Sequence, residues 1–302
     1  MRIRSRDGRI LHAVPTGDAP AGAAPIETQR RPIGLILLEM GAISPEGYAR
    51  VMAEQQRSGG LFGDVATRLG VVSPDTIRYA VERQQNFHVL RAGDNSVEPL
   101  VVAAFDPNDP LSKTVRELRG SVTAARRADG RSVRSVALLG IGTEVETTLL
   151  TANLAVAFAQ AGYRTLLVDT NLATPVHNRL FHLPNRVGVS GLLSTEGDER
   201  GAIQPSPIPN LSVLATGPDV PNATELFDRG RLFQKLRPLH DSFDMIVTDA
   251  SAGDEPAIAA CEGVDAVLLT MKKHRSSLTA VRAVSAWLKS RGTLVLGSIL
   301  TK

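Results

Sequence analysis

From Ser135 to the end of the chain, short apolar segments alternate with longer segments that have the composition of helices. The apolar segments are rich in Val, Leu and Ile, and they read VALLG, RTLLVD, LSVLATG, MIVTDA, DAVLLT and LVLGSIL. Apolar strands that alternate with helices form β–α–β units, whose parallel sheet is covered on both faces. The pattern therefore predicts an α/β domain with a mostly parallel sheet and helices on both faces. Ligands of such sheets bind at the carboxyl ends of the strands.

The N-terminal part differs, because residues 32 to 56 and residues 61 to 85 are two copies of one unit, aligned without gaps at an offset of 29 (61 − 32). The glycines that this alignment pairs are Gly34 with Gly63 and Gly41 with Gly70. In each copy an apolar helix ends at the second glycine, and Ser-Pro-Glu or Ser-Pro-Asp then begins another helix. One such helical pair cannot bury its apolar stripe alone. We therefore expect a small all-α domain of two helical repeats at residues 32–88.

Length and composition complete the domain prediction. A chain of 302 residues suits two domains, and 43% hydrophobic with 22% charged residues is typical of a globular protein. Residues 1–31 are basic and contain many Pro, Ala and Gly residues, which predicts a flexible arm. They contain no Phe, Trp or Tyr for base stacking, which argues against nucleic-acid binding. Residues 89–133 read as a linker with one helix, and residues 134–302 form the α/β domain.

The cysteine content and the length of the apolar runs bear on the cellular compartment and on possible metal or disulfide chemistry. Cys261 is the single cysteine, so an internal disulfide or a cysteine-based metal site is excluded, and we expect it to be a packing residue. Neither a membrane-spanning apolar run of about 18 residues nor the apolar segment of a signal peptide is present. We therefore predict a cytoplasmic protein without a direct membrane span, and no metal site from these residues.

Beyond residue 135 the chain resembles the cytoplasmic domain of bacterial tyrosine autokinases (BY-kinases), which accompany exopolysaccharide chain-length proteins and are related to partitioning ATPases. The resemblance is carried by TANLAVAFAQAGYRTLLVDTNLATPVHNRLFHLPNRVGVSGLL, LSVLATGPDVPNATELF, FDMIVTDA and DAVLLTMKKHRSSLTAVRAV. It implies a P-loop NTPase-like fold, ATP and Mg²⁺ as ligands and transfer of phosphate to tyrosine. It also implies a membrane-bound polysaccharide copolymerase, the chain-length protein, as partner and recruitment to the inner membrane.

The phosphate-binding motif of that family departs from its pattern here. Gly-x-Gly-Lys-Ser/Thr falls on residues 144 to 148, which read Glu-Val-Glu-Thr-Thr, so Thr147 stands at the lysine position and Thr148 keeps the hydroxyl. Two carboxylates beside a triphosphate oppose its binding by about 1 to 4 kcal/mol each. We therefore expect poor ATP binding, and we expect Thr143 and Glu146 to form a capping box in which the helix supplies its own anion.

The acidic motifs are partly kept. Where the family has Asp-x-Asp, this chain has Asp169-Thr170-Asn171, and the amide of Asn171 cannot act as a general base. Asp249, at the end of MIVTD, matches the third motif, so Asp169 and Asp249 are vestigial catalytic candidates, and Thr147, Thr148 and Asn171 form a degenerate nucleotide site. The family's C-terminal tyrosine cluster has no match among Tyr48, Tyr79 and Tyr163. The sequence favours a pseudokinase; an active autokinase or ATPase remains the alternative.

Two further features follow from resemblance. The family's oligomerisation motif Glu-x-x-Arg-x-x-Arg falls on Lys113, Arg116 and Arg119, with the sign of the first residue reversed, which puts a homo-oligomer in doubt. The repeat resembles the N-terminal domain of type II secretion and type IV pilus ATPases, some of which bind cyclic di-GMP. The matching residues are Gly34, Leu37, Gly41, Gly63 and Gly70. The motif's arginine is Pro32 or Leu61 here, which removes a bidentate contact and leaves a cyclic di-GMP-responsive adaptor as a further alternative.

Overall fold

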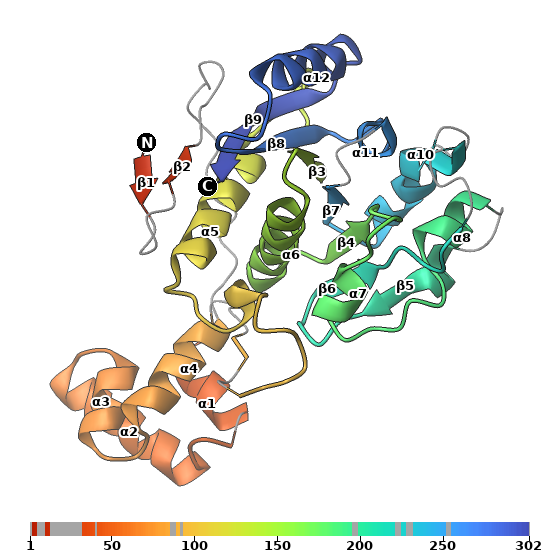
Figure 1. Cartoon of the computed structure of the whole chain (residues 1–302). Coiled ribbons are helices and arrows are strands. Elements are labelled where there is room, and N and C mark those ends of the chain that lie inside the picture. The colour runs from red at the N-terminus through yellow and green to blue at the C-terminus, as the bar shows by residue number, and fades with distance from the viewer. Residues whose placement is uncertain are drawn as a thin grey trace. The chain divides into compact units, whose positions relative to one another are not determined.

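The computed structural model describes residues 2–4, 10–12, 32–39, 41–84, 89–90, 93–194, 199–220, 225–227, 232–251 and 255–301. The chain divides into two compact units. The helical unit is residues 19–88, and the α/β unit contains residues 1–18 and 89–302 (Figure 1). Each unit has its own buried apolar core.

The α/β unit is built on a seven-stranded sheet with the order β5-β6-β4-β7-β3-β8-β9. Every neighbouring pair is parallel except β5 and β6, so the predicted mostly parallel sheet is confirmed. The strands are β3 (Ser135–Ile141), β4 (Thr165–Asp169), β5 (Ile203–Pro205), β6 (Leu211–Leu214), β7 (Met245–Ala250), β8 (Ala266–Lys272) and β9 (Leu294–Thr301). Within the predicted arm, β1 (Arg2–Arg4) and β2 (Ile10–His12) form an antiparallel pair.

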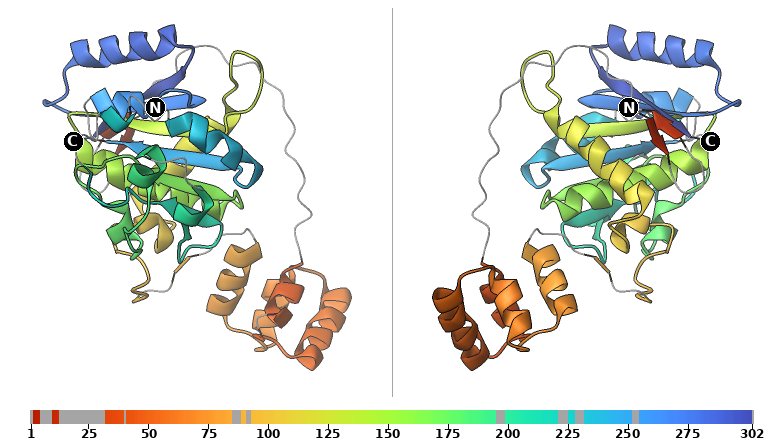
Figure 2. Two further views of the ribbon diagram at one scale, coloured as in Figure 1. Left: turned by 90° about the vertical axis from the view of Figure 1, so that its right-hand side faces the viewer. Right: turned by 90° about the vertical axis from the view of Figure 1, so that its left-hand side faces the viewer.

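Helices cover both faces of this sheet (Figure 2). One core lies under α5 (Pro110–Ala124) and α6 (Glu144–Gln160), and the other lies under α8 (Val189–Ser194), α10 (Leu232–Leu236), α11 (Glu255–Ala259) and α12 (Leu278–Ser290). The shorter helices are α7 (His177–Leu180) and the 3-10 turns η1 (Val102–Ala104), η2 (Glu199–Ala202) and η3 (Arg237–Asp241). None of the helices described has the combination of length and apolar composition that crossing a membrane requires.

The stretch that reads as a linker in the sequence is part of the α/β unit. Val101, Val115 and Val122 are fully buried in the core beside α6. Two buried amides of α6 hold the backbone of this stretch. Asn153 Oδ1 accepts the Ala103 N–H at 2.8 Å, and Gln160 Nε2 donates to the Ala103 carbonyl at 2.7 Å. Residues 89–133 therefore complete the layer on one face of the sheet and do not act only as a connection.

The helical unit contains the four helices that the duplication predicts, α1 (Ile33–Glu39), α2 (Pro45–Ser58), α3 (Phe62–Arg68) and α4 (Pro74–Gln84). Ser44 and Ser73 cap α2 and α4, since their hydroxyls accept the N–H of Gly47 at 3.1 Å and of Thr76 at 3.2 Å. The two copies bury one shared core, whose buried residues are Ile36, Leu37, Ile43, Val51, Phe62, Val65, Ala66, Val72 and Ala80. A shared core explains why the repeat occurs twice.

The paired glycines of this unit have structural roles. A Cβ at Gly34 would lie 2.6 Å from Cε2 of Tyr48, and at Gly63 it would lie 2.9 Å from Cγ2 of Ile77, the residue equivalent to Tyr48. Gly41 and Gly70 follow α1 and α3 with φ of 64° and 65°, a conformation that favours glycine. Leu37 is fully buried. Packing and turn geometry thus account for these five residues, and their contact with cyclic di-GMP stays a prediction.

Candidate functional site

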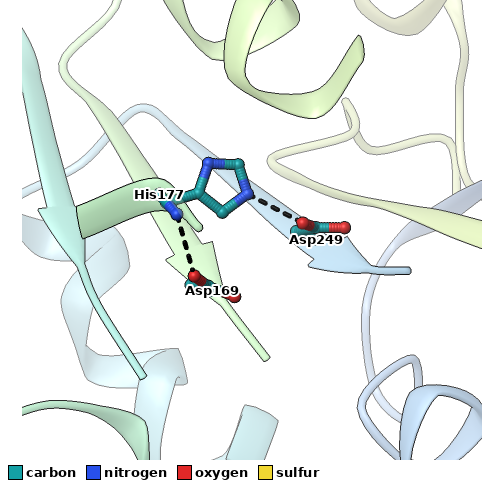
Figure 3. A group of neighbouring side chains, drawn as sticks. All are labelled: Asp169, His177 and Asp249. Atoms are coloured by element: carbon teal, nitrogen blue, oxygen red, sulfur yellow. Dashed lines mark hydrogen bonds and ion pairs between the residues drawn. The ribbon is translucent and has the colours of Figure 1, made fainter. Parts of the chain in front are cut away.

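The two aspartates that the sequence singles out lie opposite each other at the carboxyl edge of the sheet. Asp169 ends β4, Asp249 is the fifth residue of β7, and the parallel pairing places them in direct register. Both side chains are fully buried. The topology therefore brings together two carboxylates that are 80 residues apart in sequence (249 − 169). Figure 3 shows them on either side of a third residue, His177.

Asp169 is held by the backbone that follows β4. One oxygen accepts the N–H of Asn171 at 3.1 Å, and the other accepts the N–H groups of His177 at 3.2 Å and Val176 at 3.4 Å. Burial raises the pKa of Asp169 to about 6, against the attraction of His177, and the nearby charge of Asp249 also raises it. Asp169 is therefore a carboxyl whose charged form is costly in this environment.

His177 begins α7 and is the residue of this cluster that sequence reasoning missed. Its Nε2 lies 2.8 Å from Oδ2 of Asp249, and its side chain has no exposed surface. Burial lowers the pKa of His177, but the charge of Asp169 and the hydrogen bond and charge of Asp249 outweigh it and raise the pKa above its ordinary value. Only the fold reveals this role, because neither Asp169 nor Asp249 stands at a recognisable metal-ligand or catalytic spacing from His177 in the sequence.

The cluster has polar atoms that no described residue satisfies. Nδ1 of His177 and Oδ1 of Asp249 are buried without a hydrogen-bond partner in the part of the chain that the structure describes. In Figure 3 the second oxygen of Asp249 points away from His177. One ligand atom from each of Asp169, His177 and Asp249 lies within 4.8 Å of the others. Imidazole with carboxylates suits a transition metal better than Mg²⁺, which prefers oxygen ligands.

Two of the three nucleotide-site candidates, Thr148 and Asn171, are joined by Ser251, which no sequence motif singles out. Oγ1 of Thr148 donates to Oγ of Ser251 at 3.0 Å, and Nδ2 of Asn171 donates to the same oxygen at 3.1 Å. All three side chains are buried. The structure thus brings Thr148 and Asn171 together through Ser251, and their hydrogen-bonding groups are satisfied within the chain.

Thr147, at the position of the family's lysine, points elsewhere. Its side chain is fully buried, and its hydroxyl bonds to the carbonyl of Thr143 and to the hydroxyl of Thr270 on β8. The helix α6 already begins at Glu144, so only Gly142 and Thr143 separate it from β3. Residues 144 to 146, where the resemblance places a glycine-x-glycine loop, form the first turn of the helix.

The capping box expected at Thr143 and Glu146 is absent. Thr143 is the N-cap residue, with φ −154° and ψ 73°, but its side chain accepts no backbone N–H of α6. Its hydroxyl donates to Oε2 of Glu146 at 3.0 Å instead, and Oε1 of Glu146 forms an ion pair with Lys272. The prediction was wrong because the carboxylate of Glu146 bonds to the Thr143 hydroxyl and to the ammonium of Lys272, which comes from β8, and so takes part in no reciprocal cap. Burial raises the pKa of Glu146, but the hydrogen bonds and the charge of Lys272 leave it below its ordinary value.

The three residues of the expected oligomerisation motif lie on α5, and the guanidinium of Arg119 bonds to the neighbouring helix α6. Nη1 of Arg119 donates to the carbonyl of Ala157 on α6 at 2.7 Å. Burial lowers the pKa of Arg119. Arg116 is half-buried and Lys113 is exposed. Arg119 therefore joins α5 to α6, and the contribution of this motif to self-association stays a prediction.

Comparisons with known proteins agree with the resemblance. No family model matches the chain. The tyrosine-protein kinase YwqD of Bacillus subtilis (strain 168) is 27% identical over 209 residues, which cover 67% of this chain and 87% of YwqD. The tyrosine-protein kinase CpsD of Streptococcus pneumoniae serotype 4 is 26% identical over 200 residues, which cover 63% of this chain and 85% of CpsD.

Solved structures give the same result. The BceF tyrosine kinase domain superposes with a TM-score of 0.58 at 25% identity, and the match covers 66% of this chain and 81% of that domain. The homologues of this chain are thus bacterial tyrosine kinases of the BY-kinase family, and its α/β unit has the P-loop NTPase-like fold of their kinase domains.

Proposed function

We propose that this chain is a pseudokinase of exopolysaccharide synthesis and export, which keeps the fold of the bacterial tyrosine kinases without transferring phosphate. In this proposal it acts in the cytoplasm by binding a membrane-bound chain-length protein, which recruits it to the inner membrane. The homology to tyrosine-protein kinases supports the kinase part of this proposal. The polysaccharide system and the membrane partner rest on the sequence resemblance.

The observation that carries the proposal is the start of α6. A phosphate loop surrounds its ligand with several backbone N–H groups between strand and helix, and a lysine reaches the outer phosphates. Here Gly142 and Thr143 form the whole connection, and Thr147 is turned into the interior, where it bonds to Thr270. These residues do not fit a triphosphate, because both the loop and the cation are missing from their places.

Charge at the same position supports the proposal. The N-terminus of a helix attracts anions, and here Glu144 and Glu146 already lie in the first turn of α6. Lys272 lies beside this turn, but it is paired with Glu146. A triphosphate would therefore lie beside two carboxylates, at positions where the kinase family's motif has two glycines and a lysine nearby.

The acidic residues also lack the arrangement that phosphate transfer to tyrosine requires. A general base must be within reach of the proton that it removes and must carry a basic atom. Asn171 has no basic atom, and Asp169 and Asp249 are fully buried, the latter with His177 as its partner. These three residues therefore offer no exposed basic atom to a tyrosine hydroxyl.

Titration calorimetry of the full chain with Mg-ATP and with Mg-ADP tests the loss of nucleotide binding. We expect no binding heat at micromolar nucleotide, and incubation with Mg-ATP should produce no phosphotyrosine. A micromolar dissociation constant would refute the proposal. The variant Thr147→Lys sharpens the test, because restoring the lysine should not restore binding while position 147 faces the interior.

Complementation tests the role in polysaccharide production. We expect a strain that lacks this gene to show an altered chain-length distribution of its exopolysaccharide, and both the wild type and Thr148→Ala should restore it. Thr148→Ala removes the hydroxyl that would bind Mg²⁺ in an active relative and loses one buried hydrogen bond here. If the variant is folded and present at the wild-type level but does not complement, the pseudokinase proposal is contradicted.

A further inference from the structure

Two side-chain contacts join the start of α6 to β8, and a third joins the end of β3 to the turn that follows β8. Glu146 forms an ion pair with Lys272 at the end of β8. Thr147 shares a hydrogen bond with Thr270 on the same strand. Ser276, in the turn after β8, donates its hydroxyl to the carbonyl of Ile141 and accepts the N–H of Lys272. The residues in each contact are more than 120 positions apart in the sequence; Glu146 and Lys272, for example, are separated by 126 (272 − 146). The contacts thus join distant parts of the chain near the start of α6.

The contacts differ in burial, and the ion pair is the outermost of them. Thr147 and Thr270 have no exposed surface, whereas the side chains of Glu146 and Lys272 are each 28% exposed. Both carboxylate oxygens of Glu146 are used, because Oε2 accepts the hydroxyl of Thr143 while Oε1 faces Lys272. The partners of Glu146 therefore come from two directions, which fixes the orientation of its carboxylate.

This arrangement has the chemistry of a bound phosphate made from the chain itself. In a nucleotide-binding protein of this fold, an anion at the start of the helix is held by a cation and by hydroxyls. Here the carboxylate of Glu146 is the anion, Lys272 is the cation, and Thr143 is the hydroxyl. Because all three belong to one chain, their association does not depend on the concentration of a ligand.

We propose that Glu146, Thr147 and Lys272 form an internal clamp that replaces bound nucleotide as the connection between α6 and β8. The clamp holds the carboxyl edge of the sheet in one conformation at all nucleotide concentrations. It rests on the proposed function, since it assigns a structural consequence to the loss of nucleotide binding. It adds that the chain has one fixed state where an ATP-dependent relative would alternate between states.

Hydrogen exchange of the full chain, followed by mass spectrometry over residues 142–148, measures how often the clamp opens. In Glu146→Gln and in Lys272→Met we expect exchange about five- to tenfold faster than in the wild type, the size expected for losing a partly exposed, charge-assisted bond. Glu144→Gln and Lys273→Met are the matched controls, because both residues are exposed neighbours of the pair. Exchange in Lys273→Met should equal that of the wild type, and in Glu144→Gln, which also removes an anion from the first turn of α6, it should rise by less than in Glu146→Gln. Equal exchange in all four variants would overturn the clamp.

A charge reversal separates the ion pair from a general effect of acidic residues on the helix. Glu146→Lys places two ammonium groups together, and Lys272→Glu places two carboxylates together, so each should exchange faster than the neutral variants. The double variant Glu146→Lys/Lys272→Glu should recover at least part of the protection. If the two single effects multiply in the double variant, the residues act independently and the clamp is refuted.

Nucleotide addition distinguishes the clamp from the proposed function. With millimolar Mg-ADP or Mg-ATP, we expect no change in the exchange of residues 142–148 in the wild type. Slower exchange with nucleotide would refute the pseudokinase proposal and, with it, the replacement of nucleotide by the clamp. Unchanged exchange with nucleotide together with wild-type exchange in Glu146→Gln and Lys272→Met would refute the clamp alone.

Discussion

In the helical unit, the residues that the sequence singles out lie at turns and at contacts between helices, whereas in the α/β unit they are polar groups buried at the end of a sheet. Gly34 and Gly41 are explained by a close contact with Tyr48 and by a positive φ. Asp169 and Asp249 are fully buried carboxyls that face His177, and Asp169 also accepts three backbone N–H groups of the segment after β4. The same kind of sequence signal thus has a structural meaning in one unit and an electrostatic one in the other.

The two units also differ in the kinds of side chain that they bury. The helical unit has an apolar core of aliphatic side chains and one phenylalanine, Phe62. The α/β unit buries two carboxyls and an imidazole within one cluster, and buried charges are costly unless they are paired. Substitutions in the two units should therefore change the free energy of unfolding by different amounts, and these changes should depend on pH in different ways.

The largest effect is expected from His177→Ala. It leaves Asp249 buried without its partner at 2.8 Å and removes the positive charge beside Asp169. Removing one member of a buried ion pair costs about 3 to 5 kcal/mol of unfolding free energy. Denaturant unfolding followed by the fluorescence of Trp287, the single tryptophan of the chain, reports on this unit.

The control for that measurement is His182→Ala. His182 also pairs with a carboxylate, Glu98, at 2.9 Å, but both side chains are more than 40% exposed, at 43% and 45%. Exposed pairs contribute about 0 to 1 kcal/mol. Equal costs for the two histidine variants would contradict the electrostatic interpretation of the cluster.

A smaller effect is expected in the helical unit from Gly34→Ala. Its Cβ would lie 2.6 Å from Tyr48 and 2.9 Å from Phe62, which forces these rings to move. Overpacking of this kind costs about 1 to 3 kcal/mol. Calorimetry of the full chain should show a lower transition temperature for the helical unit.

Gly120→Ala on α5 is the matched substitution, because a Cβ there meets no atom within 4 Å. Alanine is favoured over glycine in a helix by about 0.5 to 1 kcal/mol, so this variant should be neutral or slightly stabilised. If Gly34→Ala behaves in the same way, then close packing does not explain that glycine.

The smallest expected effect is the pH dependence that Asp169 adds. Its pKa is raised in the folded state from 3.8 to about 6, so its contribution to stability is fully present below pH 3.8 and is lost as the pH rises through 6. Between pH 5 and pH 8 this loss amounts to roughly 1.4 kcal/mol. The raised pKa of His177 acts in the same direction, with its contribution lost above its ordinary value of 6.5.

Asp169→Asn should remove that part of the pH dependence. The variant loses hydrogen bonds at every pH, so its absolute stability falls, but the difference between its stabilities at pH 5 and pH 8 should be smaller than in the wild type. Unfolding followed by Trp287 fluorescence at both pH values gives the two differences. An unchanged difference would show that Asp169 does not titrate in this range.

Much of the fold could be read from local patterns. The alternation after Ser135 predicts the parallel sheet, and the duplication with its Ser-Pro caps predicts four helices close to where they lie. Residues 89–133 could not be assigned in the same way, because their burial depends on Asn153 and Gln160 of α6, which follow them in the chain. Local patterns predict the helix in this stretch, but they do not show which part of the chain it packs against.

For the candidate site, the sequence by itself determined which positions differ from the pattern of the family that it resembles. It has Glu144, Glu146 and Thr147 where that pattern has glycines and a lysine, and it has Asp169 and Asp249 near the ends of strands. Only the tertiary structure decided which partners these side chains have. His177, Ser251 and Lys272 reach the site from separate segments, and no spacing in the sequence connects them with their partners. The physical reason is that a buried charge must be paired by whichever group the fold brings near it, and that choice depends on strand order and register.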